Sequence, residues 1–284
     1  MKDFIEYLIL SFFYFLFKLL GLKISSFLGG LIFYFYGIFS KRNKTVKENL
    51  YKVFPNLGKS ERNRIVKNMW FHFGRVIGEY PNLGKIKLFK HLLIENESNL
   101  IEPLRKYENC LFFSAHIGNW ELTSHLLTQK GYKINFIYRA PNNKFADNLL
   151  RKIRIGYGVG LIKKGNIGAK QCLKILKMNG GHIGMLIDQK MNDGIETKFF
   201  NETVKSPSAI AKFALKFDCP IIPAVCFREK TTNFRVSYLK PINPKELRSI
   251  GSEKEIMNYL NGYVEQWIRK YPEQWIWFHN RWSN

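Results

Sequence analysis

The sequence of 284 residues lacks the signature motifs of several large enzyme classes. It has no Gly-x-Ser-x-Gly elbow, no His-Glu-x-x-His pair, no P-loop and no Gly-x-Gly-x-x-Gly fingerprint followed by an acidic residue. The run Gly-Tyr-Gly-Val-Gly at 156–160 comes nearest to the last of these, but its glycines have the wrong spacing. These absences argue against an α/β-type serine hydrolase, a zinc peptidase, a P-loop nucleotidase and a dinucleotide-binding enzyme.

Cysteine is also scarce, and its spacing suits neither a disulfide framework nor a metal site. The four cysteines, Cys110, Cys172, Cys219 and Cys226, form no CxxC pair, and three of them stand in apolar surroundings. We therefore expect buried free thiols and a reducing, cytoplasmic compartment. The histidines have no metal-ligand spacing either, and His182, inside an apolar run, is expected to be a core residue. We predict no metal site.

Acidic residues are few: 22 aspartates and glutamates stand against 45 lysines and arginines, which gives a net charge of +23. An excess of this size indicates either nucleic acid or an anionic membrane surface with acidic ligands as the partner. The 24 phenylalanines favour the membrane, because a nucleic-acid binder does not need so much apolar aromatic surface. A hydrophobic content of 46% excludes a disordered chain.

The N-terminus contains the long hydrophobic runs of the chain. Residues 4–22 are nearly all apolar, and residues 24–39 carry no charge, so each approaches the roughly 20 residues that cross a bilayer. A cleaved signal peptide fits poorly because the apolar stretch is too long and no small-x-small site follows it. We expect a membrane anchor over 1–40, with a buried helical hairpin as the alternative. Basic residues at 41–47 place the rest of the chain on the cytoplasmic side. Whether the anchor spans, forms a hairpin or lies in the interface stays open.

The remainder, 41–284, alternates helical and strand patterns without repeats or low-complexity linkers. This order predicts one catalytic α/β domain with a mostly parallel mixed sheet flanked by helices, whose sites lie at the carboxyl ends of strands. Strands are expected at 110–115, 133–139, 182–188, 219–227 and 233–239. Helices are expected at 59–79, 120–130, 145–155, 170–178, 208–217 and 253–270.

His116 and Glu121 follow the first of these strands and form the leading candidate site. On a regular helix, residues five apart point about 140° away from each other, so His116 is expected in the turn and Glu121 in the first helical turn. A glutamate bonded to one imidazole nitrogen would fix the tautomer and leave the other nitrogen as a base. The alternative is a surface histidine and a helix-terminal glutamate with no joint role.

Four blocks of the sequence resemble a known family. Residues 114–122, Ser-Ala-His-Ile-Gly-Asn-Trp-Glu-Leu, are similar to the His-x4-acid block of glycerolipid acyltransferases, in the glutamate form of the lipid A biosynthesis acyltransferases. Residues 137–143, 186–200 and 272–282 resemble later blocks of that narrower family. The likeness covers nearly the whole chain. It implies a glycerolipid acyltransferase-like fold behind the hydrophobic anchor.

The resemblance also implies an activity: transfer of a fatty acyl chain from an acyl carrier protein thioester to a hydroxyl of an anionic, Kdo-bearing lipid A precursor. The thioester is then a co-substrate, and no cofactor or nucleic acid takes part. His116 would be the general base with Glu121 as its partner, while Arg154 and Asp188 match site positions of the family. Arg139 fits a role in gripping phosphate or a sugar acid. The location would be the bacterial inner membrane, with the catalytic domain on its cytoplasmic face.

Direct attack of the acceptor hydroxyl on the thioester needs donors for the oxyanion. Backbone amides near Gly118, or a nearby basic side chain, are the candidates from the sequence. Ser114 and the cysteines have no assigned base, so an acyl-enzyme is not expected. The aromatic tail, 271–282, is either an interfacial belt or core packing.

The chain departs from the family's usual pattern at two positions and has two rivals. Ala115 stands where many members have asparagine, and Lys190 where some have an acid, which leaves the acceptor and chain-length preference open. A glycerophospholipid or other glycolipid acyltransferase would normally have His-x4-Asp and a Pro-Glu-Gly-type phosphate block. A membrane-attached nucleic-acid-binding protein would explain the charge but leave the His–Glu turn unused.

Overall fold

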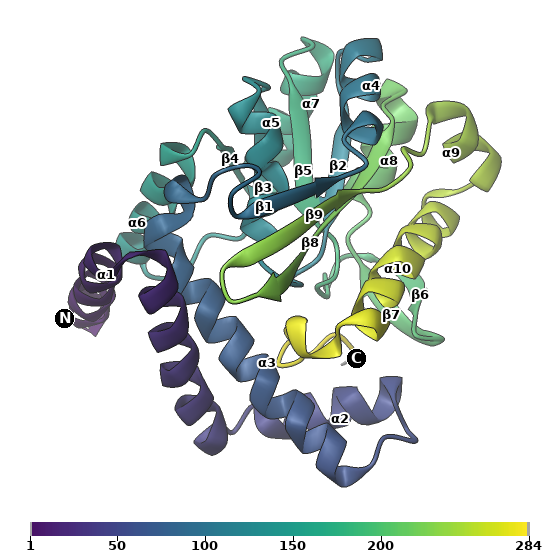
Figure 1. Cartoon of the computed structure of the whole chain (residues 1–284). Coiled ribbons are helices and arrows are strands. Elements are labelled where there is room, and N and C mark those ends of the chain that lie inside the picture. The colour runs from purple at the N-terminus through teal and green to yellow at the C-terminus, as the bar shows by residue number, and fades with distance from the viewer. Residues whose placement is uncertain (1, 283–284) are drawn as a thin grey trace.

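The computed structural model describes residues 2–282, in which helices cover both faces of a central sheet (Figure 1). The sheet has seven strands in the order β1-β9-β8-β2-β5-β3-β4, and β6 and β7 form a separate antiparallel hairpin. The strands are β1 (Leu92–Glu95), β2 (Leu111–Ser114), β3 (Ile134–Tyr138), β4 (Gly160–Lys163), β5 (His182–Leu186), β6 (Ile195–Phe199), β7 (Glu202–Ser206), β8 (Ile221–Lys230) and β9 (Asn233–Tyr238).

Every neighbouring pair in the seven-stranded sheet is parallel except β8 and β9, which run antiparallel. The predicted class, a mostly parallel mixed sheet flanked by helices, is therefore confirmed. The central strands β2 and β8 are buried on both faces, which is why their sequences are nearly continuous apolar runs rather than alternating ones.

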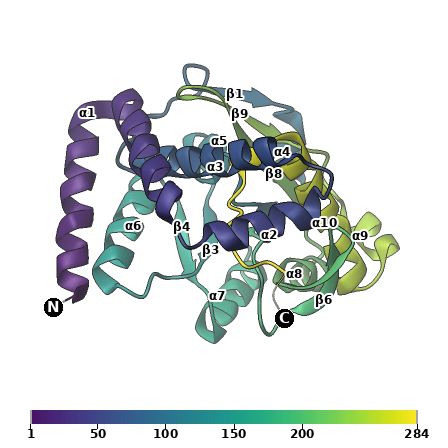
Figure 2. The same ribbon diagram turned by 90° about the horizontal axis from the view of Figure 1, so that it is seen from below.

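The α-helices are α1 (Lys2–Phe39), α2 (Asn43–Val53), α3 (Lys59–Glu79), α4 (Ser98–Lys106), α5 (His125–Gln129), α6 (Lys144–Gly156), α7 (Asn166–Lys177), α8 (Ala209–Phe217), α9 (Pro244–Ile250) and α10 (Glu253–Lys270). Three short 3-10 helices are η1 (Tyr80–Lys85), η2 (Trp120–Ser124) and η3 (Pro272–Gln274). Figure 2 shows α1, α2 and α3 together on the side of the molecule seen from below.

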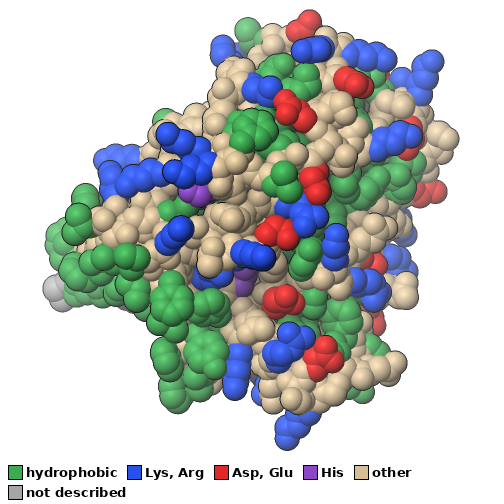
Figure 3. Space-filling model, in the orientation of Figure 1, with side chains coloured by type: hydrophobic (Ala, Val, Ile, Leu, Met, Phe, Trp, Pro, Cys, Tyr) green, Lys and Arg blue, Asp and Glu red, His purple; other side chains and the backbone are tan. Residues whose placement is uncertain are grey.

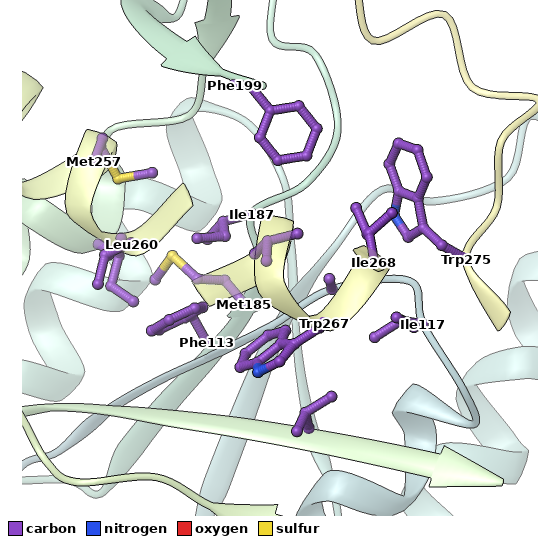
Figure 4. Packing of buried hydrophobic residues seen from close by; sticks show 14 of the residues in the cluster. Phe113, Ile117, Met185, Ile187, Phe199, Met257, Leu260, Trp267, Ile268 and Trp275 are labelled. Carbon is purple, nitrogen blue, oxygen red and sulfur yellow. The ribbon is translucent and has the colours of Figure 1, made fainter. Parts of the chain in front are cut away.

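Two hydrophobic cores lie on opposite faces of the sheet. Phe113 and Met185 of the central strands face the larger core, which α7, α8 and α10 help to close, and Phe112 faces the smaller one. The tail packs in the larger core, where Trp275 and Trp277 are almost fully buried. Figure 4 shows Trp275 among the core residues. Of the two alternatives for the aromatic tail, core packing is therefore the one observed for these tryptophans.

The two apolar runs at the N-terminus form one helix, α1, that is kinked at Gly21 (φ 74°). Its second half packs so closely on α3 that a Cβ added to Gly29 would lie 2.4 Å from the carbonyl oxygen of Gly74. Within residues 2–282, α1 is the helix that is long and apolar enough to cross a membrane, and only 11% of its apolar window is buried. This exposure does not fit the alternative of a buried helical hairpin.

Helix and strand predictions are correct for the long, strongly patterned elements, and α3 and α10 have the predicted bounds. The helix predicted at 120–130 is instead divided into η2 and α5. Thr123 and Ser124 donate back to the carbonyls of Trp120 and Glu121, a spacing of three residues that suits a 3-10 turn. Elements without a sequence prediction are α2, α4, α9, η1, η3, β1, β4 and the β6–β7 hairpin.

The four cysteines are buried free thiols, which agrees with the prediction for the three in apolar surroundings and extends it to the fourth. His182 is likewise a buried core residue, as predicted. Its Nδ1 accepts the backbone N–H of Cys110 at 3.1 Å. Burial lowers the pKa of His182 to about 4, so the ring stays neutral and can accept that bond. No group of three or more potential metal ligands occurs among the described residues.

Candidate active site

His116 and Asp188 occupy matching positions just beyond two neighbouring parallel strands. Ser114, the last residue of β2, pairs in register with Leu186, the last residue of β5, and each functional side chain comes two residues later. The carboxyl ends of parallel strands meet at one edge of the sheet, where open α/β folds bind their ligands. The Nδ1 atom of His116 lies 2.9 Å from Oδ1 of Asp188.

Asp188 is a buried carboxylate whose second oxygen also has partners. Its Oδ2 accepts the backbone N–H of His116 at 3.0 Å and the indole N–H of Trp275 at 2.8 Å. Burial opposes ionisation, but the charge of His116 and these hydrogen bonds outweigh it and lower the pKa of Asp188 to about 2. Because the ionised carboxylate can only accept, Nδ1 of His116 carries the proton and Nε2 presents a lone pair.

The structure therefore corrects the predicted partner of His116. Glu121 was expected to bond to the imidazole, yet its carboxylate instead accepts two hydrogen bonds from Arg154 of α6. The physical reason is the strand order, since β5 lies directly beside β2 and brings Asp188 to the histidine. Glu121 does lie in the first turn of η2, as expected, but in a different set of contacts.

Glu121 is the centre of a buried polar cluster. Nε and Nη2 of Arg154 donate to its two oxygens at 3.0 and 2.6 Å, and the hydroxyls of Tyr80 and Tyr157 donate at 2.8 and 2.6 Å. Burial opposes ionisation, but the charge of Arg154 and these bonds lower the pKa of Glu121 to about 2. Burial and the Glu121 charge raise the pKa of both tyrosines, which stay protonated donors. Within the part of the chain that the structure describes, Nη1 of Arg154 has no hydrogen-bond partner.

A cavity of about 610 Å³ joins these two groups of residues. The last paired residues of β3 and β5 are Phe136 and Gly184, and the residues that follow them in both strands line the cavity. The cavity therefore lies where the two strands separate at the carboxyl edge of the sheet. The lining combines positive charge with an apolar surface. Basic lining residues are Arg139, Arg154, Lys163, Lys164 and Lys190, and apolar ones include Phe136, Met185, Leu186, Ala209 and Phe213.

A histidine at the wall of a basic and partly apolar cavity suits a reaction between an anionic molecule and one with a long apolar chain. A family model described as bacterial lipid A biosynthesis acyltransferase matches residues 2–284. The chain belongs to this family. Among curated proteins, none matches the sequence. The family makes the protein an acyltransferase of lipid A biosynthesis, as the sequence blocks indicated.

In this acyltransferase, four of the five predicted site residues line the one cavity: His116, Glu121, Arg139 and Arg154. The fifth, Asp188, does not line the cavity but holds the imidazole from behind. Arg139 is exposed at the cavity wall, and Arg154 has a fixed orientation through its two bonds to Glu121. The sequence prediction therefore identified a set of residues that the fold does bring together.

The turn that carries His116 is held by close backbone contacts. Gly118 has a φ of 58°, and a Cβ at this position would lie 1.7 Å from the carbonyl oxygen of Cys226, so that only glycine fits. Its carbonyl oxygen bonds to Nε2 of His72 at 3.1 Å, and its N–H donates to the Gln274 carbonyl at 3.0 Å. The position of the turn that carries His116 is thereby fixed by α3 and by the tail.

A buried ion pair between Glu79 and Arg228 also contacts the turn that carries His116. Glu79, at the end of α3, receives two hydrogen bonds from the guanidinium of Arg228, at 2.6 and 2.8 Å. It also accepts from Nδ2 of Asn119 at 2.8 Å and from the hydroxyl of Ser26 on α1 at 2.6 Å. One carboxylate thus joins the N-terminal helix, α3, β8 and the catalytic turn.

Sequence reasoning missed several residues of the site. Tyr80 and Tyr157, which bond to Glu121, follow α3 and α6 without any local motif. Trp275, which bonds to Asp188, and His279, which lines the cavity, belong to the tail block that resembled the family. That block was the available signal for the last two, although it did not show what they contact.

Proposed function

We propose that the protein transfers a fatty acyl chain from an acyl carrier protein thioester to a hydroxyl of an anionic, Kdo-bearing lipid A precursor. The observation that carries the proposal is that His116, on the wall of a basic, partly apolar cavity, has Nδ1 held by Asp188, while Nε2 has no hydrogen-bond partner within residues 2–282. The geometry suits direct transfer between two substrates that meet at this nitrogen.

In the proposed reaction His116 is the general base. Nε2 takes the proton of the acceptor hydroxyl while the hydroxyl oxygen adds to the carbonyl carbon of the thioester. The electron pair of the carbonyl double bond moves to the carbonyl oxygen. When this pair returns, the carbon–sulfur bond breaks and the thiolate leaves with the proton from Nε2. Asp188 stabilises the imidazolium between the two steps, which a buried ionised carboxylate does well. The products are the acylated lipid and the free thiol of the carrier.

Glu121 acts in this proposal through Arg154. Its carboxylate uses two of the guanidinium nitrogens and thereby fixes the direction of the third, Nη1, for an oxygen of the acceptor. Arg139 and the lysines of the cavity wall add positive charge for phosphate and carboxylate groups. Glu121 is then a positioning residue for substrate binding rather than the partner of the base.

The proposal places the protein at the inner membrane, with residues 1–40 as the anchor and 41–284 as the catalytic domain on the cytoplasmic face. Large apolar side chains are exposed along both halves of α1, and Figure 3 shows hydrophobic side chains gathered where α1 lies. A bilayer would bury these apolar side chains, which without it would stay exposed to water. The net charge of +23 suits an anionic leaflet, an acidic carrier protein and an anionic acceptor.

The test is an assay of membranes from cells that express the protein, supplied with acyl carrier protein thioester and a labelled Kdo-lipid A precursor. We expect transfer in the wild type and its loss in His116→Ala. His91→Ala, which removes a histidine outside the cavity, is the matched control and should transfer normally. Undiminished transfer in His116→Ala would contradict the assigned base. Transfer to a lysophosphatidic acid acceptor in preference to the lipid A precursor would instead indicate glycerolipid synthesis.

A further inference from the structure

The C-terminal tail brings a second histidine to the cavity that contains His116. The tail runs directly beside the catalytic turn, because Ile276 N donates to the His116 carbonyl at 3.3 Å and Ile117 bridges with Trp275. His279 follows three residues later and lines the cavity. Its backbone is fixed as well, since its carbonyl oxygen accepts from Nδ2 of Asn49 at 2.9 Å. Nothing described so far uses its side chain.

The hydrogen bonds of His279 determine which ring nitrogen carries the proton. Nε2 accepts the backbone N–H of Lys190 at 2.9 Å, so in the neutral ring the hydrogen is on Nδ1. Burial lowers the pKa of His279 to about 4, and the ring is neutral at physiological pH. Between residues 2 and 282, no group accepts a hydrogen bond from Nδ1, and this atom is not among the buried unpaired ones.

The backbone amides that the sequence suggested as oxyanion donors are already engaged. The N–H of His116 donates to Asp188 and that of Gly118 to the Gln274 carbonyl. The Ile117 N–H donates to the Ala115 carbonyl at 2.7 Å. The turn therefore offers no free amide at these three positions for the negative oxygen of a tetrahedral intermediate.

We propose that the Nδ1–H of His279 donates a hydrogen bond to the thioester carbonyl oxygen and stabilises it as the oxyanion forms. The inference rests on the proposed acyl transfer and adds a catalytic residue to it. The hydrogen stays on Nδ1 throughout: the carbonyl electron pair moves to oxygen, returns, and the carbon–sulfur bond breaks. A neutral imidazole suits this task because it can donate without acting as an acid that would compete with His116.

Two amide substitutions separate this role from a structural one. An asparagine amide nitrogen takes a place close to that of Nδ1, whereas a glutamine oxygen reaches the place of Nε2. His279→Asn therefore keeps a donor toward the cavity, and His279→Gln keeps an acceptor for the Lys190 N–H. If His279 only supported the loop at Lys190, the glutamine variant would be the more active of the two.

We expect His279→Gln to lower kcat by about 10²-fold, as loss of one oxyanion donor does, with an unchanged KM for the thioester. His279→Asn should be at least tenfold faster than His279→Gln. A smaller ratio, or the reverse order, would overturn the proposal.

A second measurement needs no transfer, and so separates this inference from the proposed function. The carbonyl stretch of a carbon-13-labelled acyl carrier protein thioester, bound without acceptor, should move to lower wavenumber on wild-type protein and on His279→Asn. On His279→Gln it should match the free thioester. Equal bands on the three proteins would overturn the inference, even where His116→Ala abolishes transfer as proposed.

Discussion

Asp188 Oδ1 accepts a hydrogen bond from Nδ1 of His116 at 2.9 Å, across the carboxyl ends of two adjacent parallel strands. The carboxylate thereby selects the tautomer of the histidine and leaves Nε2 unprotonated. The structure therefore pairs His116 with Asp188 rather than with Glu121, five residues along the chain.

Asp188→Asn tests the pair directly. The side-chain amide can donate to Nδ1 and stabilise the wrong tautomer, so we expect kcat to fall by about 10³- to 10⁴-fold. The change is isosteric, so the circular dichroism spectrum should remain that of the wild type. Asp193→Asn is the control, because Asp193 lines the same cavity but is exposed. Activity within tenfold of wild type in Asp188→Asn would rule out the proposed orienting role.

Glu121 should make stability depend on pH in acid. Its pKa is lowered from 4.5 to about 2, so its ionised form stabilises the fold fully above pH 4.5, and this contribution is lost as pH falls toward 2. The difference in the free energy of unfolding between wild type and Glu121→Gln should shrink by about 2 kcal/mol from pH 6 to pH 3. Urea unfolding in detergent at the two pH values measures it. A constant difference would contradict the ionised, buried state of Glu121.

Arg154→Lys should show that geometry, and not charge alone, matters in the Glu121 cluster. A lysine cannot make the two parallel bonds that Nε and Nη2 of Arg154 make, nor present a third nitrogen to the cavity. We expect a loss of about 1–2 kcal/mol in stability and at least a tenfold rise in KM for the acceptor. Arg151→Lys, on the same helix, is the control and should change neither quantity much. Equal KM values for the two variants would count against a substrate contact.

Gly118→Ala should distort the catalytic turn. The added Cβ would overlap the Cys226 carbonyl, and the φ of 58° is unfavourable for alanine, so we expect a loss of about 3 kcal/mol in stability. Thermal unfolding and transfer rate are the measurements. Gly262→Ala in α10 is the matched control: its Cβ would meet no atom within 4 Å, and it should stabilise the helix slightly. If Gly118→Ala kept wild-type stability and rate, this result would contradict the close approach of Gly118 to the Cys226 carbonyl.

The sequence was sufficient for the fold class because the strongest local patterns belong to the elements that build it. The apolar runs at 110–115 and 182–188 contain β2 and β5, and the helical spacing at 59–79 gives α3 its bounds. Short or mixed elements were missed for the same reason. β4 has four residues of which only one is fully buried, whereas the equally short β2 is buried throughout, and the β6–β7 hairpin mixes charged with apolar side chains.

The site could be predicted as a set of residues but not as a set of contacts. His116, Glu121, Arg154 and Asp188 were all identified, yet which carboxylate meets the imidazole depends on strand order. No local pattern states that β5 lies beside β2, so proximity along the chain favoured Glu121 over Asp188. Tyr80 and Trp275 were out of reach for the same reason, because each meets its carboxylate only through the tertiary fold.

The tail that contacts the catalytic turn has a consequence for how the enzyme is made. Trp275, which holds Asp188, and His279, at the cavity wall, are synthesised after every other part of the site. α1 leaves the ribosome long before the tail, so the apolar segment is available to the bilayer before the site can be assembled. A product of premature termination between α1 and the tail would therefore contain α1 but would lack a complete site.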